Sequence, residues 1–96
     1  MNSEAQKMTV IRRHLSQILP GWRIEDGSRT GVDRTIMLFD GATLRSTIQI
    51  GMDLLQDTRL SPDELEQPLR NSDLADRVRS GPVVYLNNNT LGIKAG

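Results

Sequence analysis

Hydrophobic side chains recur every three or four residues in the first twenty positions of the chain. This spacing places them on one stripe of an α-helix. The stripe consists of Met8, Ile11, Leu15, Ile18 and Leu19. Val10 is the hydrophobic residue that the same spacing places on the outward face. Pro20 and Gly21 interrupt the pattern, because proline lacks a donor N–H and restricts the residue before it. We therefore predict a helix from about residue 4 to residue 19.

Alternating polar and hydrophobic residues then predict two strands. The first covers Trp22 to Glu25, and the polar, glycine-containing segment 26–31 is expected to form a loop. The second runs from Arg34 to Phe39 and ends at Asp40-Gly41. An Asp-Gly pair between two strands is a strong hairpin signal.

A third strand is predicted from about Ala42 to Leu54. Its inward residues are Leu44, Ile48, Ile50 and Met52, and Gly51 is interpreted as a bulge.

Two registers are possible for the hairpin that joins the second and third strands. We favour a three-residue loop, which pairs Ile36 with Leu44 and leaves Met37 and Phe39 on the opposite face. A two-residue turn would instead place Met37 and Phe39 with Leu44, since a slip of one residue exchanges the faces of a strand.

The second half of the chain begins with a strong helix-start signal. Ser61 is the predicted N-cap, Pro62 takes the first helical position, and Glu64 completes a capping box. Pro68 predicts a break near Gln67, because proline in a helix interior costs about 3 kcal/mol.

A further helical segment is predicted from Asn71 or Ser72 to Gly81-Pro82, with Leu74, Ala75 and Val78 turned inward. The hydrophobic residues 83–86 predict a strand, the asparagines at 87–89 a turn, and residues 90–93 a short edge strand.

The order of these elements is α-β-β-β-α-β, followed by the short edge strand. It predicts a single α+β domain over residues 1–96, with an antiparallel sheet of three to four strands in two layers. The N-terminal helix and the broken second helix would pack on that sheet. With 36% hydrophobic residues and few aromatics, the core is expected to be thin, and oligomerisation is one remedy for a thin core.

Composition narrows the function classes. Twelve basic residues balance twelve acidic ones, so no overall field favours nucleic acid or an anionic membrane. The chain has no cysteine, which excludes disulfides and thiolate metal sites. It has no continuous hydrophobic run of the length that spans a bilayer. We expect a soluble, cytoplasmic protein with no membrane partner.

No catalytic, cofactor or metal site is predicted. His14 is the single histidine and lies at the border of the hydrophobic stripe, where a structural role is expected. No Gly-x-Ser-x-Gly elbow occurs, and the glycine-containing segment 26–31 lacks the ending of a phosphate loop. The acidic residues Asp63, Glu64 and Glu66 suit a helix N-terminus. The chain is therefore expected not to be an enzyme.

Arginine is the distinctive basic residue, and arginines concentrate in the first half. They are Arg12, Arg13, Arg23, Arg29, Arg34 and Arg45. The α-β-β-β-α order is shared with the double-stranded-RNA-binding domain. The basic run that opens the last helix of that family is replaced here by Ser-Pro-Asp-Glu-Leu-Glu at 61–66, so the order supports no family assignment. A nucleic-acid-associated regulator that uses these arginines is the alternative function.

The leading hypothesis is a non-enzymatic protein-interaction module, such as a small accessory, regulatory or inhibitor protein, with a homodimer through its sheet as one form. Met37, Phe39 and Arg45 would form a contact patch on the face opposite the helices, and methionine, phenylalanine and arginine are enriched in protein interfaces. Arg29 and Arg34 would add a contact loop. The competing interpretation is that the second helical region crosses to that face and buries Met37 and Phe39.

Overall fold

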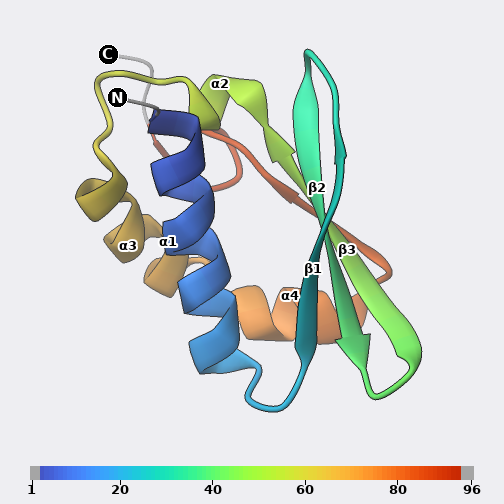
Figure 1. Ribbon diagram of the computed structural model, residues 1–96. Coiled ribbons are helices and arrows are strands. Elements are labelled where there is room, and N and C mark those ends of the chain that lie inside the picture. The colour runs from blue at the N-terminus through green and yellow to red at the C-terminus, as the bar shows by residue number, and fades with distance from the viewer. Residues whose placement is uncertain (1–2, 94–96) are drawn as a thin grey trace.

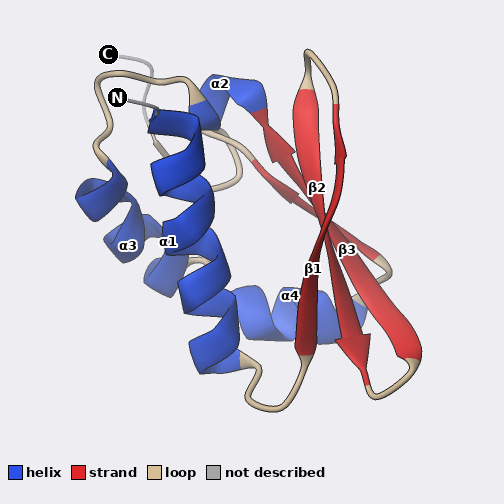
Figure 2. Ribbon diagram, in the orientation of Figure 1, coloured by secondary structure: helices blue, strands red, loops and turns tan. Residues whose placement is uncertain are grey.

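A four-stranded sheet is covered by helices on one face within residues 3–93, the part of the chain that the computed structural model describes (Figure 1, Figure 2). In chain order the elements are α1 (Ser3–Ile18), β1 (Arg23–Arg29), β2 (Asp33–Asp40), β3 (Thr43–Gly51), α2 (Met52–Leu55), α3 (Pro62–Asn71), α4 (Leu74–Ser80) and β4 (Val83–Leu86). The predicted two-layer α+β architecture is confirmed.

The amphipathic stripe of α1 faces the sheet as its spacing predicts. Met8, Ile11 and Leu15 are buried in the core. The prediction that Val10 points outward is wrong. Val10 is 5% exposed, because α3 packs along that side of α1 and places Pro62 beside it. The helix therefore uses a wider face than its hydrophobic stripe alone indicates.

The strands follow one another across the sheet in the order β1-β2-β3-β4. The first three are antiparallel, whereas β4 runs parallel to β3. The sheet is therefore mixed and not purely antiparallel. A parallel neighbour requires a crossover connection. The segment from α2 to α4 supplies it by carrying the chain from the end of β3 back to its start (Figure 1).

The predicted loop over 26–31 is shorter than expected. β1 continues to Arg29, with a register irregularity between Asp26 and Arg29. The turn is tight because the Thr30 hydroxyl accepts hydrogen bonds from the main-chain N–H groups of Val32 and Asp33, both at 3.1 Å. Most of the polar segment thus belongs to a hairpin, where its side chains are held in fixed positions.

The β2–β3 hairpin takes neither of the two predicted registers. Asp40 pairs with Thr43, so Gly41 and Ala42 form the turn, and Gly41 takes a φ of 63° that favours glycine. A bulge follows, because Phe39 pairs with Leu44 and Leu38 with Ser46.

The bulge decides which residues of β2 and β3 reach the core. Ile36, Leu38 and Ile48 share the buried face, as the favoured register predicts. Leu44 does not join them, and Ser46 takes its place. The Ser46 hydroxyl donates to the carbonyl of Gly81 at 3.2 Å, which satisfies this buried polar group.

β3 ends at Gly51, three residues before the predicted end. Met52 is buried as predicted and Leu54 is buried as well, but both lie in the short helix α2 and not in a strand. Gly51 precedes that helix and is not a bulge. A Cβ at this position would meet the carboxylate of Asp53 and the Cβ of Asn87, so a larger residue would require the Asp53 side chain to move.

The start of α3 confirms the sequence signal in full. The Ser61 hydroxyl accepts from the Glu64 N–H, and the Glu64 carboxylate accepts from the Ser61 N–H, both at 3.1 Å. The predicted break near Gln67 is wrong, since α3 continues through Pro68 to Asn71. Leu65 and Leu69, one turn apart, are fully buried, and this burial outweighs the hydrogen bond that Pro68 cannot donate.

The predicted helix and strand that follow α3 are both present. α4 begins at Leu74 after Asp73, which has a positive φ of 53°. Leu74 and Val78 are buried, whereas Ala75 is partly exposed. β4 covers the predicted residues 83–86.

The edge strand predicted over 90–93 does not form. These residues make turns instead, with the N–H of Leu91 donating to the Asn87 carbonyl at 3.1 Å and that of Ile93 donating to the Asn88 carbonyl at 2.8 Å. β4 is therefore the last strand of the described chain.

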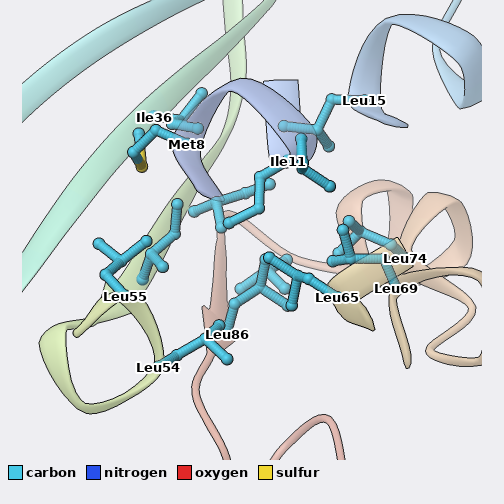
Figure 3. Close-up of a cluster of buried hydrophobic side chains, with 14 of the residues drawn as sticks. Met8, Ile11, Leu15, Ile36, Leu54, Leu55, Leu65, Leu69, Leu74 and Leu86 are labelled. Carbon is cyan, nitrogen blue, oxygen red and sulfur yellow. The ribbon is translucent and has the colours of Figure 1, made fainter. Parts of the chain in front are cut away.

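The core is one cluster of aliphatic side chains between the sheet and the helices (Figure 3). Leucines from α1, α2, α3 and α4 meet isoleucines from β2 and β3. The labelled members are Met8, Ile11, Leu15, Ile36, Leu54, Leu55, Leu65, Leu69, Leu74 and Leu86. Every cluster member lies on the helix side of the sheet, so the other face takes no part in the core.

Candidate functional site

The sheet face that points away from the helices has no element over it within residues 3–93 (Figure 1). Residues that pair across strands share a face, so the register identifies which side chains lie there. We call this surface the open face. It carries Arg23, Glu25, Met37, Phe39, Leu44, Thr47, Gln49, Val83 and Tyr85.

The structure places Met37 and Phe39 on the open face. Met37 lies between Glu25 and Thr47, and both Met37 and Phe39 are half-buried by their neighbours. α4 packs on the opposite face of the sheet and α3 packs on α1, so neither helix covers them. Helices therefore leave this part of the sheet free.

Phe39 is partly covered by a cation. The Arg23 guanidinium carbon lies 4.3 Å from the centre of the Phe39 ring, and Arg23 also forms an ion pair with Glu25. Such a cation–π contact is worth about 0.5–1 kcal/mol at an exposed site. The contact holds the Phe39 ring and the Arg23 side chain in one arrangement on the open face.

Large hydrophobic side chains are exposed on the open face. Leu44 is 50% exposed, Val83 41% and Tyr85 56%. Val32, in the turn between β1 and β2, is also exposed at 77%. Hydrophobic residues that gather on one uncovered face, with polar residues between them, are typical of a protein-binding surface.

Arg45, the third predicted patch residue, lies in the bulge after Leu44. It is exposed, and no ion pair of Arg45 occurs within the described chain. Arg45 borders a groove of about 360 Å³ at the end of the sheet. The other lining residues are Trp22, Thr43, Leu44, Val78, Arg79, Ser80, Gly81 and Pro82. Arg45 and Arg79 are thus two cations beside a groove whose other lining residues are uncharged.

Arg29 and Arg34 do not form a free contact loop. Both bind the carboxylate of Glu4 in α1, Arg29 through two hydrogen bonds of 2.8 and 2.9 Å and Arg34 through one of 3.1 Å. The hydrogen bond from Arg29 is the main reason that the pKa of Glu4 lies below its usual value, and Arg34 adds to the effect. These two predicted site residues fasten the β1–β2 hairpin to α1.

Lys7 is a buried cation that the sequence interpretation missed. It is 0% exposed, and its Nζ donates to the carbonyl oxygens of Leu54 at 2.8 Å and Asp57 at 2.6 Å. Burial lowers the pKa of Lys7, and the nearby Asp57 carboxylate opposes that shift. Lys7 precedes Ile11 and Leu15 at steps of four, so its place on the hydrophobic stripe was the available signal. It fixes α2 and the following loop to α1.

His14 is half-buried, as its border position predicts. Burial lowers its pKa, the positive charge of Arg70 lowers it further, and the charge of Glu66 opposes both. No group of three or more histidine, cysteine or acidic residues in residues 3–93 is arranged to hold a metal ion. His14 therefore packs at the α1–α3 border.

Most arginines of the first half are engaged with acidic partners. Arg12 pairs with Asp26 at 3.6 Å and Arg13 with Glu66 at 2.7 Å. Arg23, Arg29 and Arg34 are paired as described above. Each partner brings a negative charge to the surface where a phosphate would bind. Arg12, Arg13, Arg29 and Arg34 thus link different elements of this chain, and Arg23 pairs within β1, so these five arginines form no open basic stripe.

No family model, no curated protein and no solved structure matches this chain. Within the described residues, no helix is both long enough and hydrophobic enough to cross a bilayer.

Proposed function

We propose that this chain is a non-enzymatic protein-interaction module that binds its partner through the open face of the sheet. The observation that carries the proposal is the concentration of exposed hydrophobic residues on the one sheet face that no helix covers. Leu44, Val83 and Tyr85 lie there beside the half-buried Met37 and Phe39. The proposed module would be a small accessory, regulatory or inhibitor protein.

Two further features support a protein partner. The open face mixes hydrophobic side chains with uncharged polar ones such as Thr47 and Gln49, which suits the core and rim of a protein interface. Arg23 stacks on the Phe39 ring and favours one arrangement of that ring before any partner binds. A side chain that is already ordered loses less conformational entropy on binding.

Capture from an extract of the protein's own cells, with substitutions on the two faces, tests the proposal. Phe39→Asp and Met37→Asp place a charge in the middle of the open face, and each is expected to reduce partner capture at least tenfold. The matched control is Gln67→Asp, an equally charged change at an exposed position of α3. Circular dichroism must show that all three variants are folded. Capture that survives both open-face substitutions would overturn the proposal.

Nucleic-acid binding is the second candidate, and no observation favours it over a protein partner. Arg12, Arg13 and Arg34 are each paired with a carboxylate. Binding of this kind weakens steeply as salt is added, because counterions are released. Fluorescence titrations with duplex and single-stranded probes at low salt are expected to show no binding.

A further inference from the structure

β4 is the outer strand of the sheet, and the direction of its main-chain groups follows from one hydrogen bond. The N–H of Thr47 in β3 donates to the carbonyl of Pro82 at 2.8 Å. Successive residues of a strand point their main-chain groups to alternate sides. The main-chain N–H and C=O groups of Val84 and Leu86 therefore point toward β3. Those of Val83 and Tyr85 point away from the sheet.

The outward groups of Val83 and Tyr85 have no hydrogen-bond partner within the described chain. The residues on either side are already engaged. The Gly81 carbonyl accepts from Ser46, and the Asn87 N–H donates to the Thr90 hydroxyl at 2.9 Å. The Asn87 carbonyl accepts from Leu91. The free edge is thus limited to two residues, with Val84 between them.

A groove of about 360 Å³ lies along this edge, where a fifth strand would run. Its lining residues are Arg77, Ser80, Gly81, Val83, Val84, Tyr85 and Thr90. Arg77 is exposed, so its guanidinium stays in water at the rim when a strand fills the groove. An edge with unpaired main-chain groups beside a groove is the arrangement that accepts an added strand.

The opposite edge of the sheet is protected against such pairing. β1 carries Arg23, Glu25, Asp26 and Arg29, and its register is irregular between Asp26 and Arg29. Charges and irregular register are devices that prevent edge-to-edge association. β4 has neither, since all four of its residues are uncharged and hydrophobic. The two edges therefore differ in their capacity to pair.

We propose that β4 pairs antiparallel with β4 of a second copy of this chain about a twofold axis at Val84. In this register Val83 of each copy lies opposite Tyr85 of the other. The free N–H and C=O groups of Val83 and Tyr85 in both copies then form hydrogen bonds with one another. A twofold axis at Val83 or at Tyr85 would place one pair against Gly81 or Asn87, whose groups are already engaged.

Side chains favour the same register. Opposite residues of an antiparallel pair share a face, so the exposed Val83 and Tyr85 of the two copies lie next to each other on the open face. A β-branched residue beside an aromatic is a favourable cross-strand pair. The absence of charge in β4 means that two copies meet without repulsion between their paired strands. The dimer would join the two sheets into one continuous sheet.

A single introduced cysteine tests the register, because the chain has none of its own. At the axis the two Val84 residues form a non-hydrogen-bonded pair, with Cα atoms about 4.5 Å apart, within the range that a disulfide bridges. Val84→Cys is expected to give a disulfide-linked dimer under mild oxidation. Leu44→Cys, exposed on the open face but away from the edge, is expected to stay monomeric on a non-reducing gel. Equal cross-linking of both variants would overturn the proposal.

Sedimentation of the unsubstituted chain tests the association without any risk to folding. A concentration-dependent monomer–dimer equilibrium is expected. Tyr85→Pro removes one outward N–H but no bond to β3, so it should weaken the dimer at least tenfold while β3–β4 pairing persists. Tyr85→Thr keeps the N–H and should weaken the dimer less. A strict monomer at every concentration would overturn the proposal, whatever the result for the open face.

The dimer does not rest on the proposed function, and the two can fail separately. Phe39→Asp should abolish partner capture and leave the dimer intact. Sedimentation without any partner reports on the dimer alone, so a strict monomer that still captures a partner would overturn the dimer and leave the proposed function standing.

Discussion

The guanidinium carbon of Arg23 lies 4.3 Å from the centre of the Phe39 ring, on the sheet face that no helix covers. The two residues are direct cross-strand partners in β1 and β2. Arg23 therefore shields part of a large aromatic ring while that ring stays available at the surface. This pair shows how the open face can be both ordered and hydrophobic in the free protein.

The Arg23–Phe39 pair should have a measurable coupling energy. In a double-mutant cycle with Arg23→Ala and Phe39→Leu, the interaction is expected to contribute about 0.5–1 kcal/mol to the free energy of unfolding. Urea denaturation of the four proteins measures it. A coupling energy of zero would show that Arg23 does not hold the ring.

Lys7 should make stability depend on pH in the alkaline range. Lys7→Met leaves the Leu54 and Asp57 carbonyls without their charged donor, and is expected to lower the free energy of unfolding by about 1–3 kcal/mol at pH 7. Burial lowers the pKa of Lys7 in the folded state below its usual value of 10.5. In the interval between the folded and unfolded pKa values the unfolded chain binds more protons, so stability rises with pH there.

The test for Lys7 is the difference between the unsubstituted chain and Lys7→Met. That difference should widen as pH rises toward 10.5 and become constant above it. Urea denaturation at several pH values in this range gives the comparison, and groups common to both proteins cancel. A difference that narrows with rising pH would mean that burial does not depress the pKa of Lys7.

The contribution of Glu4 to the free energy of unfolding should depend on pH in the acid range. Hydrogen bonds from Arg29 and Arg34 lower the pKa of Glu4 in the folded state below its usual value of 4.5. Its contribution is therefore fully present above that value and is lost as pH falls through the lower, folded pKa. Glu4→Gln should be less stable than the unsubstituted chain at pH 7 and equally stable near pH 2. A stability gap that persists unchanged at pH 2 would contradict this role.

Pro68 should be a destabilising residue. It lies inside α3 and cannot donate to the carbonyl one turn earlier. Pro68→Ala is expected to raise the free energy of unfolding by about 2 kcal/mol, which is the helix-interior cost of about 3 kcal/mol reduced by the greater freedom of the unfolded chain. Thermal and urea unfolding measure the change. A loss of stability would mean that the proline ring has a packing role that outweighs the missing bond.

The sequence was a good guide where one local pattern determined one element. The hydrophobic stripe of α1 and the capping box at Ser61 are patterns of this kind, and both were predicted correctly. The β2–β3 register was not, because a bulge after Leu44 changes which side chains reach the core and local alternation does not indicate its position. The helix break near Pro68 was predicted from the local cost of a proline inside a helix. The burial of Leu65 and Leu69, which favours a continuous helix, is a tertiary effect.

The candidate site likewise divides into features that local patterns predict and features that tertiary contacts determine. Met37 and Phe39 lie on the face that the favoured register gave them, although the hairpin itself takes another register. Arg29 and Arg34 were expected to belong to a contact loop, whereas both bind Glu4 of α1, twenty-five and thirty positions away in the chain. The exposure of Val83 and Tyr85 depends on β4 pairing parallel to β3 at the edge, which no local pattern indicates.

A photocross-linking amino acid tests the role of the open face most directly. With p-benzoylphenylalanine in place of Leu44, irradiation of cells that produce the protein should yield a covalent adduct with a partner. The same amino acid in place of Gln67, exposed on α3, should yield none. Adducts at position 67 and their absence at position 44 would contradict the assignment of the open face as the binding surface.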